Sequence, residues 1–216
     1  MATIATPVQG DRRVVFHDVP WETYLGLLNA RGEDLTRLTY HRGVLEIMTL
    51  SKLHEILSEF LGGFVKVLAK EYGLEVQSAG SMTMHAERLN VGGEADKTYY
   101  IQHEEIVRDR EQYDPAIDPP PDLAVEVDLS SSSSRRMLVF AELGVPELWQ
   151  YDGERLVFKA LGDDGAYHII ERSLTFHGLS AADLESFVHR RGTMGQLALE
   201  EELATWVRAF LQTGRQ

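Results

Sequence analysis

The sequence contains no cysteine, and this single absence excludes several kinds of site. A disulfide framework, a thiolate zinc site and a cysteine nucleophile are all ruled out together. Long hydrophobic runs are absent as well, since no stretch approaches the roughly 18 apolar residues of a membrane-spanning helix. The first residues also lack the basic and apolar regions of a secretory signal peptide. We therefore expect a cytoplasmic protein with no membrane partner.

Basic residues are scarce: 21 Lys and Arg stand against 34 Asp and Glu, which gives a formal net charge of −13. Proteins that bind nucleic acid normally present a basic face to the phosphates. Bulk charge therefore argues against such a partner, although a metal site can gather carboxylates and still act on phosphate. A DNA-facing surface would require three arginine pairs to converge, namely Arg12-Arg13, Arg135-Arg136 and Arg190-Arg191.

The pattern of apolar residues predicts one domain of alternating helices and strands. The clearest helix covers 51–72 and ends at Gly73. Other helices are expected near 20–28, 135–143, 182–189 and 200–211, and strands within 38–48, 74–78, 81–86, 95–101, 123–129 and 146–171. This order indicates an α/β fold, with a central mixed sheet flanked by helices and a C-terminal helical tail. We expect a loose segment at 1–14, the main domain at 15–175 and its helical extension at 176–216.

Two carboxylates occupy alternate positions of the apolar run 123–129. Glu126 and Asp128 should point to the same face of a strand, about 6.6 Å apart. Burying two unpaired carboxylates is costly, and a divalent cation such as Mg²⁺ would relieve that cost because it binds hard oxygen ligands. Asp122 shares their face but lies about 13 Å from Glu126 on an ideal strand. The same alternation also fits an edge strand with solvated acids, so the pattern alone leaves both interpretations open.

The segment around these acids resembles a known family. Pro121-Asp122-Leu123-Ala124-Val125-Glu126-Val127-Asp128, followed by a short helix and Gly144-Val145-Pro146-Glu147-Leu148-Trp149, is similar to a large bacterial family of restriction-endonuclease-like proteins. That family belongs to the PD-(D/E)XK nuclease superfamily. The resemblance extends upstream to 43–48, to the helix that contains His54 and to Glu94-Ala95-Asp96, and it covers roughly residues 15–160.

The resemblance implies a restriction-endonuclease-like core and a set of site residues. Asp96 and Glu126 match the metal-binding acids of the superfamily motif. Glu46 matches an acidic residue before the long helix, and Asp122 matches a second Pro-Asp. The implied site therefore has Asp96, Glu126, Asp128, Glu46 and Arg136 as catalytic residues and Asp96, Glu126, Asp128 and Asp122 as ligands of Mg²⁺ or Mn²⁺.

The sequence departs from the motif at its lysine. Asp128 stands where the superfamily has this lysine, and Arg136 stands where many relatives carry one on the next helix. Arginine can stabilise phosphate charge but is a poor base, since its pKa exceeds about 12. Lys97 is next to Asp96, but adjacent residues of a strand point to opposite faces. His54 fits either a surface or helix-capping imidazole, or a base or phosphate contact.

Two functions of different classes remain open on these grounds. The first is a metal-dependent endonuclease that hydrolyses DNA phosphodiester bonds; cleavage of both strands would favour a homodimer. The second is a catalytically degenerate nuclease-fold protein that acts as an interaction module, which the missing lysine and the acidic balance favour. A metal hydrolase for a small phosphoester is a third interpretation. For the fold, we expect Val145, Leu148 and Trp149 to be buried beside the long helix.

Overall fold

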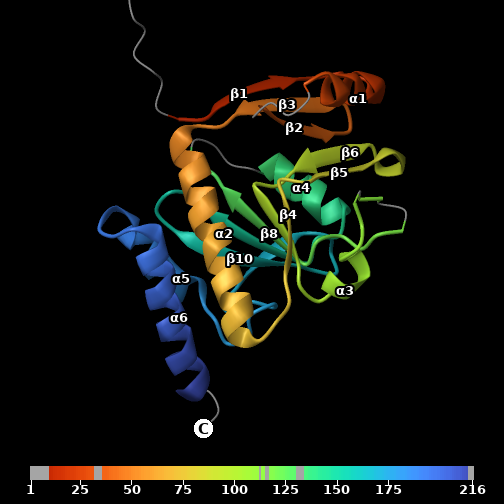
Figure 1. The fold of residues 1–216 in the computed structure, drawn as a ribbon. Helices are drawn as coiled ribbons and strands as arrows, with labels where there is room; N and C mark the ends of the chain where they lie inside the picture. The colour runs from red at the N-terminus through yellow and green to blue at the C-terminus, as the bar shows by residue number, and fades with distance from the viewer. Residues whose placement is uncertain (1–9, 32–35, 112, 115–116, 130–133, 214–216) are drawn as a thin grey trace, which may run out of the picture.

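A computed structural model describes residues 10–31, 36–111, 113–114, 117–129 and 134–213 (Figure 1). Its strands form two sheets. The five-stranded sheet has the order β1 (Arg12–Phe16), β3 (Val44–Thr49), β2 (Thr36–His41), β6 (Val91–Glu94) and β5 (Thr83–Ala86). The six-stranded sheet has the order β11 (Tyr167–Ile170), β10 (Leu156–Leu161), β9 (Glu147–Tyr151), β8 (Leu123–Val127), β7 (Lys97–Tyr100) and β4 (Gln77–Gly80).

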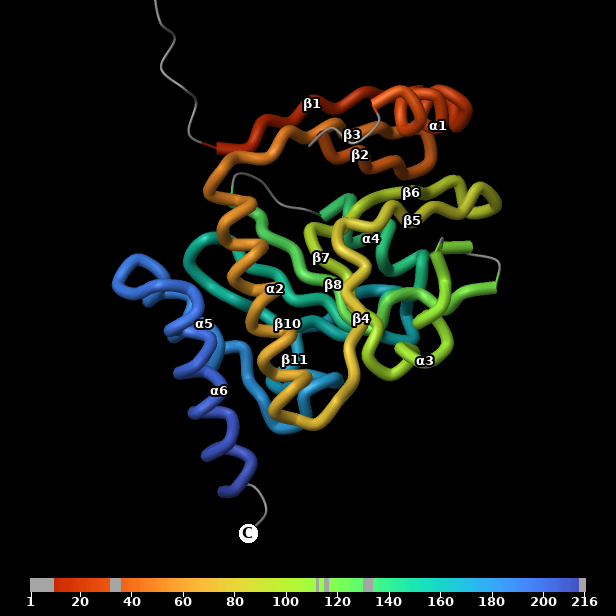
Figure 2. The backbone as a smooth tube through the Cα atoms, in the orientation of Figure 1, coloured from red at the N-terminus to blue at the C-terminus, as the bar shows by residue number. Residues whose placement is uncertain are grey.

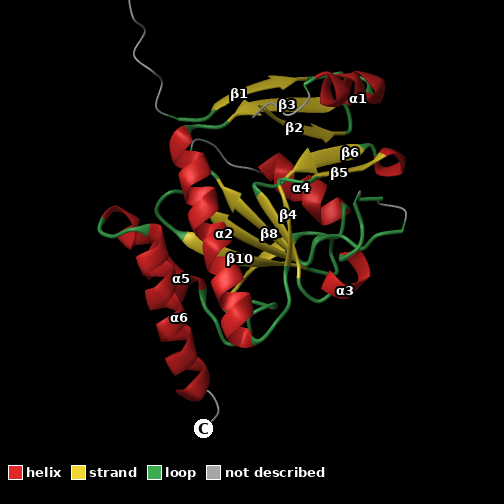
Figure 3. Cartoon of the chain, viewed as in Figure 1, coloured by secondary structure: helices red, strands yellow, loops and turns green. Residues whose placement is uncertain are grey.

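The six-stranded sheet is mixed, because β8 and β9 run parallel while its other neighbouring strands are antiparallel. Helices lie against it, as Figure 3 shows for α2. The helices are α1 (Trp21–Ala30), α2 (Lys52–Tyr72), α3 (Glu104–Val107), α4 (Ser134–Glu142), α5 (Ala181–His189) and α6 (Gln196–Thr213). The expected α/β fold is confirmed, and the second sheet is an addition that the sequence did not indicate. None of the described helices is both long and apolar enough to cross a membrane.

Helix α2 forms as its sequence predicts. Ser51 caps its first turn by accepting a hydrogen bond from the backbone nitrogen of His54, and Gly73 ends it in the left-handed conformation. Its apolar face packs with β8, β9, α5 and α6 in the larger core. Figure 2 shows the backbone of α2 running from the five-stranded sheet across the six-stranded one. The helix therefore connects the two sheets.

Helix α4 packs between the sheets. Its Val139 and Phe140 share a second core with Ala124 of β8 and with Met84 and Val91 of the five-stranded sheet. One face of β8 is therefore covered by α2 and the other by α4. Both faces of this strand are buried, and any polar side chain on them needs a partner.

Three expectations need correction. The segment predicted to be loose ends earlier than residue 14, because β1 begins at Arg12 and pairs with β3 through its backbone; residues 1–9 lie outside the described part. Strand β6 was not predicted because two of its four residues are glycine, which lacks the side chain of a typical strand former. Val145 and Leu148 lie in the α4 core and only Trp149 reaches the α2 core, because side chains alternate along β9.

Gly92 of β6 provides a test of this packing. A Cβ added there would clash with the hydroxyl group of Tyr24, whose ring is fully buried and stacks on Tyr40. We expect Gly92→Ala to lower the free energy of unfolding by about 1–3 kcal/mol, as overpacking does. Gly26→Ala in α1 is the matched control, since nothing lies within 4 Å of its Cβ, and it should be neutral or stabilising by up to about 1 kcal/mol. Urea unfolding of both variants checks this, and equal effects would contradict it.

Candidate active site

Asp96 and Glu126 lie side by side where β7 begins and β8 ends. Lys97 pairs with Val125, so Asp96, one residue earlier, falls opposite Glu126. The backbone nitrogen of Asp96 donates to Glu126 Oε1 at 3.1 Å, and the backbone nitrogen of Val127 donates to Asp96 Oδ2 at 2.7 Å. Both side chains are buried, and β8 lies between β7 and β9. The edge-strand interpretation of Glu126 is therefore excluded.

Arg136 brings a positive charge to this pair from α4. Its Nη1 lies 2.9 Å from Glu126 Oε2, and both side chains are almost completely buried. Burial alone would lower the pKa of Arg136, but the carboxylates around it, Glu126 first and then Asp96, Asp128 and Glu46, raise it above its ordinary value. Arg136 therefore contacts Glu126 and interacts electrostatically with the other three acids.

The acidity of Glu126 is strongly perturbed. Burial raises its pKa to about 8, the Arg136 guanidinium opposes the rise, and the neighbouring Asp96 carboxylate adds to it. Two carboxylates that share a buried site disfavour each other's charge. Such perturbed groups are common in active sites. A bound cation would also reduce the repulsion between the two carboxylates.

His54 and Asp11 form the other side of the site. His54 Nε2 lies 2.9 Å from Asp96 Oδ2 and His54 Nδ1 lies 2.9 Å from Asp11 Oδ2. Burial opposes charge on the ring, but the two carboxylates raise the pKa of His54 to about 10. A charged imidazole between two carboxylates cannot accept a proton, so this geometry argues against His54 as a base. No pattern in the sequence marked Asp11, which reaches the site from the position just before β1.

Glu46 lies in β3 and forms ion pairs with two arginines. Glu46 Oε2 lies 3.3 Å from Nη1 of Arg13 and 3.2 Å from Nη1 of Arg135. Arg13 of the first pair and both members of the second pair, Arg135 and Arg136, therefore lie beside the buried acids. In the third pair, Arg190 lies 2.7 Å from Glu202 of α6 instead.

Asp128 lies just beyond β8, half-buried, on the same side as Glu126. Its Oδ2 accepts a hydrogen bond from Gln150 Nε2 at 3.4 Å, and the Asp128 charge also acts on Arg136 and on Lys159 of β10. Gln150 and Lys159 were missed by sequence reasoning. Only the pairing of β8, β9 and β10 shows that Gln150 neighbours Glu126 and that Lys159 lies on the same face of the sheet, and no local motif marks either residue.

Asp122 is not brought to this cluster. It lies at the other end of β8, where Oδ2 accepts hydrogen bonds from the backbone nitrogens of Ile101 at 2.6 Å and His103 at 3.0 Å. It therefore closes the turn that follows β7. Lys97 points to the α2 side of the sheet, where its ammonium pairs with Glu59.

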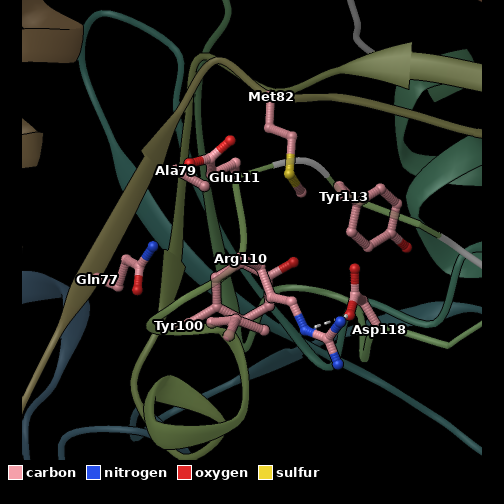
Figure 4. A pocket seen from close by; sticks show the side chains of 9 residues that line it. Gln77, Ala79, Met82, Tyr100, Arg110, Glu111, Tyr113 and Asp118 are labelled. Atoms are coloured by element: carbon pink, nitrogen blue, oxygen red, sulfur yellow. Dashed lines mark ion pairs between the residues drawn. The ribbon is translucent and has the colours of Figure 1, made fainter.

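A pocket of about 260 Å³ lies near that far end of β7 (Figure 4). Arg110 Nε and Asp118 Oδ1 face each other across it at 3.6 Å, beside Tyr100 and Tyr113. None of the predicted site acids lines it. The candidate active site is therefore the buried acidic cluster, not this hollow.

The model of one protein family matches residues 21–191 of the chain. This span contains Glu46, Asp96, Glu126 and Arg136. The description of the family is "Uma2: Putative restriction endonuclease". The chain belongs to the Uma2 family. No curated protein matches the chain with statistical significance. Membership agrees with the resemblance noted in the sequence and indicates a nuclease.

Restriction-endonuclease-like families such as Uma2 generally use divalent metals, so the fit of the cluster to a metal matters. Within the described ranges, no group of three or more His, Asp or Glu side chains is arranged as a metal cage. Asp96 Oδ1 is nevertheless buried without a hydrogen-bond partner, next to the Glu126 carboxylate. Mg²⁺ commonly uses one or two carboxylates and takes its other ligands from water and phosphate. The residues present therefore fit an ion of this kind.

Proposed function

We propose that this Uma2 protein is a divalent-metal-dependent endonuclease that hydrolyses phosphodiester bonds of DNA. The observation that carries the proposal is the buried pair of Asp96 and Glu126, in which Asp96 Oδ1 has no hydrogen-bond partner. Hard oxygen donors of this kind suit Mg²⁺ or Mn²⁺. The family match supports a nuclease, and the metal and DNA parts of the proposal rest on this site chemistry.

Each residue of the cluster has a role in this proposal. Asp96 and Glu126 would hold the metal, with Asp128 and Glu46 completing its shell directly or through water. A bound divalent metal polarises the phosphate and lowers the pKa of a water molecule. Arg136 holds Glu126 in place and offsets negative charge. In the overall reaction, water oxygen bonds to phosphorus, one ester P–O bond breaks, and the leaving oxygen receives a proton. Asp122 is left out because its carboxylate binds the turn after β7.

The distribution of arginines supports DNA as the substrate despite the net negative charge. Arg13 and Arg135 both lie at Glu46, beside the acidic pair, and both are partly exposed. Phosphate contacts depend on such local groups more than on the charge of the whole chain. A cytoplasmic location, and a dimer that cuts both strands, are further parts of the proposal.

One observation favours the second candidate function, a non-catalytic interaction module. Arg136 already neutralises Glu126 at 2.9 Å, so the folded protein has a charge partner for this acid without a metal. Calorimetric titration with Mn²⁺ separates the two functions. The endonuclease should bind the ion at micromolar to low-millimolar concentration through Glu126, whereas the module should show no heat of binding.

The proposed function predicts that wild type nicks supercoiled plasmid DNA with Mg²⁺ or Mn²⁺ and that Glu126→Ala does not. Loss of a direct ligand should exceed the 10–100-fold typical of outer-shell partners, so we expect a rate reduced by more than about 100-fold. Glu201→Ala, at an exposed position of α6, is the matched control and should nick like wild type. Equal background nicking by all three proteins would refute the endonuclease.

A further inference from the structure

The buried cluster has more negative than positive side chains near the proposed reaction centre. Arg136 is already paired with Glu126, and three further carboxylates act on its charge. A phosphate that gains negative charge in the transition state needs a positive group aimed at it. A cation on the same face of the sheet that no carboxylate contacts at short range would meet this need.

Lys159 is on that face. Glu126 of β8 pairs with Gln150 of β9, and Gln150 pairs with Val157 of β10. Paired residues point to the same side of a sheet, and Lys159 is two residues after Val157, so it shares their face. Helix α4, which carries Arg136, covers this face of the sheet.

The contacts of Lys159 place its ammonium beside Gln150, the residue that hydrogen-bonds Asp128. Nζ donates to Gln150 Oε1 at 2.6 Å and lies 3.2 Å from the Met137 sulfur of α4. Gln150 in turn donates to Asp128 Oδ2 at 3.4 Å. An ammonium has three donor hydrogens, and these two described contacts are to a neutral amide and a thioether.

The environment of Lys159 is unlike that of a surface lysine. The side chain is half-buried, and burial lowers its pKa, with the Asp128 carboxylate opposing the shift. The charged form is therefore poorly solvated and would gain from contact with an anion. Lys97, by comparison, lies on the opposite side of the sheet and is paired with Glu59.

We propose that Lys159 is a catalytic residue of this site, whose ammonium donates a hydrogen bond to a non-bridging oxygen of the scissile phosphate while Gln150 holds it in position. This rests on the proposed nuclease function. Lys159 supplies charge and takes no part in bond making: the water attacks phosphorus, and the proton it loses goes to solvent. The site thus obtains from β10 a positive group that position 128, an aspartate, does not provide.

Lys159→Met tests the proposal, because it retains most of the side-chain volume and removes the charge. Plasmid nicking at saturating DNA should fall by about 10²–10³-fold, the usual cost of one transition-state hydrogen-bond donor. Ion binding in calorimetry and the urea midpoint should stay near the wild-type values. Lys159→Arg should recover part of the rate, since it restores a cation. Lys66→Met, at an exposed position of α2, is the matched control and should nick like wild type.

The outcomes separate this proposal from the function beneath it. If wild type nicks, Glu126→Ala does not and Lys159→Met keeps the wild-type rate, Lys159 is not catalytic and the nuclease stands. If wild type itself does not nick, the nuclease and the role of Lys159 are refuted together. If Lys159→Met unfolds, Lys159→Gln is measured instead, and a folded Lys159→Gln with the wild-type rate refutes the proposal.

Discussion

Trp149→Ala should lower the free energy of unfolding by about 3–5 kcal/mol, the largest loss we expect from a single core truncation. The Trp149 side chain is fully buried in β9 and stacks on Phe158 with ring centroids 4.5 Å apart. Its Nε1 also donates to Glu147 Oε1 at 2.8 Å. Removing the ring leaves a cavity in the α2 core and takes one donor from a buried carboxylate.

Urea unfolding followed by circular dichroism measures this loss. Trp206→Ala in α6 is the comparison, because Trp206 is only partly buried and stacks on Phe210 near the end of the chain. Trp206→Ala should lower the free energy of unfolding clearly less than Trp149→Ala does. A cost below about 1 kcal/mol for Trp149→Ala would mean that β9 is not the centre of this core.

The parts of the fold that sequence could predict are those with strong local signals. Helix α2 has helical periodicity, a serine at its start and a glycine at its end, and each of these acts within a few residues. Strand β6 has two glycines and is held by pairing with β2 and β5. That pairing is a long-range property, so the second sheet could not be deduced from local pattern.

The site residues also divide into those with a local signal in the sequence and those placed by long-range contacts. The alternation around Glu126 marked an unusual strand, and the resemblance supplied Asp96, Glu46 and Arg136. Asp11 and Lys159 carried no signal, because Asp11 reaches the cluster through its contacts with Ser51 and His54, and Lys159 through the register of β10 with β9. Asp122 shared the parity of Glu126, but parity fixes only the face of a strand, and its neighbours form the turn that binds it.

Arg136→Met should lower the free energy of unfolding by about 3–5 kcal/mol at about pH 9, where Glu126 is ionised, because it removes the cation from a buried ion pair and leaves the Glu126 charge without it. The nearby Asp96 carboxylate increases the repulsion that remains. Arg135→Met is the matched control on the same helix. Arg135 is more exposed and contacts Glu46 at 3.2 Å, so its loss should cost about 0–1 kcal/mol.

The cost of Arg136→Met should also depend on pH. The pKa of Glu126 is about 8 in the folded protein and 4.5 for an ordinary glutamate, so between these values the folded protein keeps a proton that the unfolded chain has lost. Stability from this group therefore falls as pH rises through that window. Without Arg136 the folded pKa rises further and the fall continues above pH 8, so Arg136→Met should cost more at about pH 9 than at about pH 6.

A double-mutant cycle identifies the cause of this cost. Glu126→Gln removes the charge that Arg136 balances, so adding it to Arg136→Met should recover stability, with a coupling energy of about 0.5–3 kcal/mol. Measurement in a chelator keeps adventitious metal from replacing the lost cation. A cost equal to that of Arg135→Met at both pH values, with no coupling to Glu126, would show that Arg136 does not balance the acidic pair. The charge partner of Glu126 would then have to be another group.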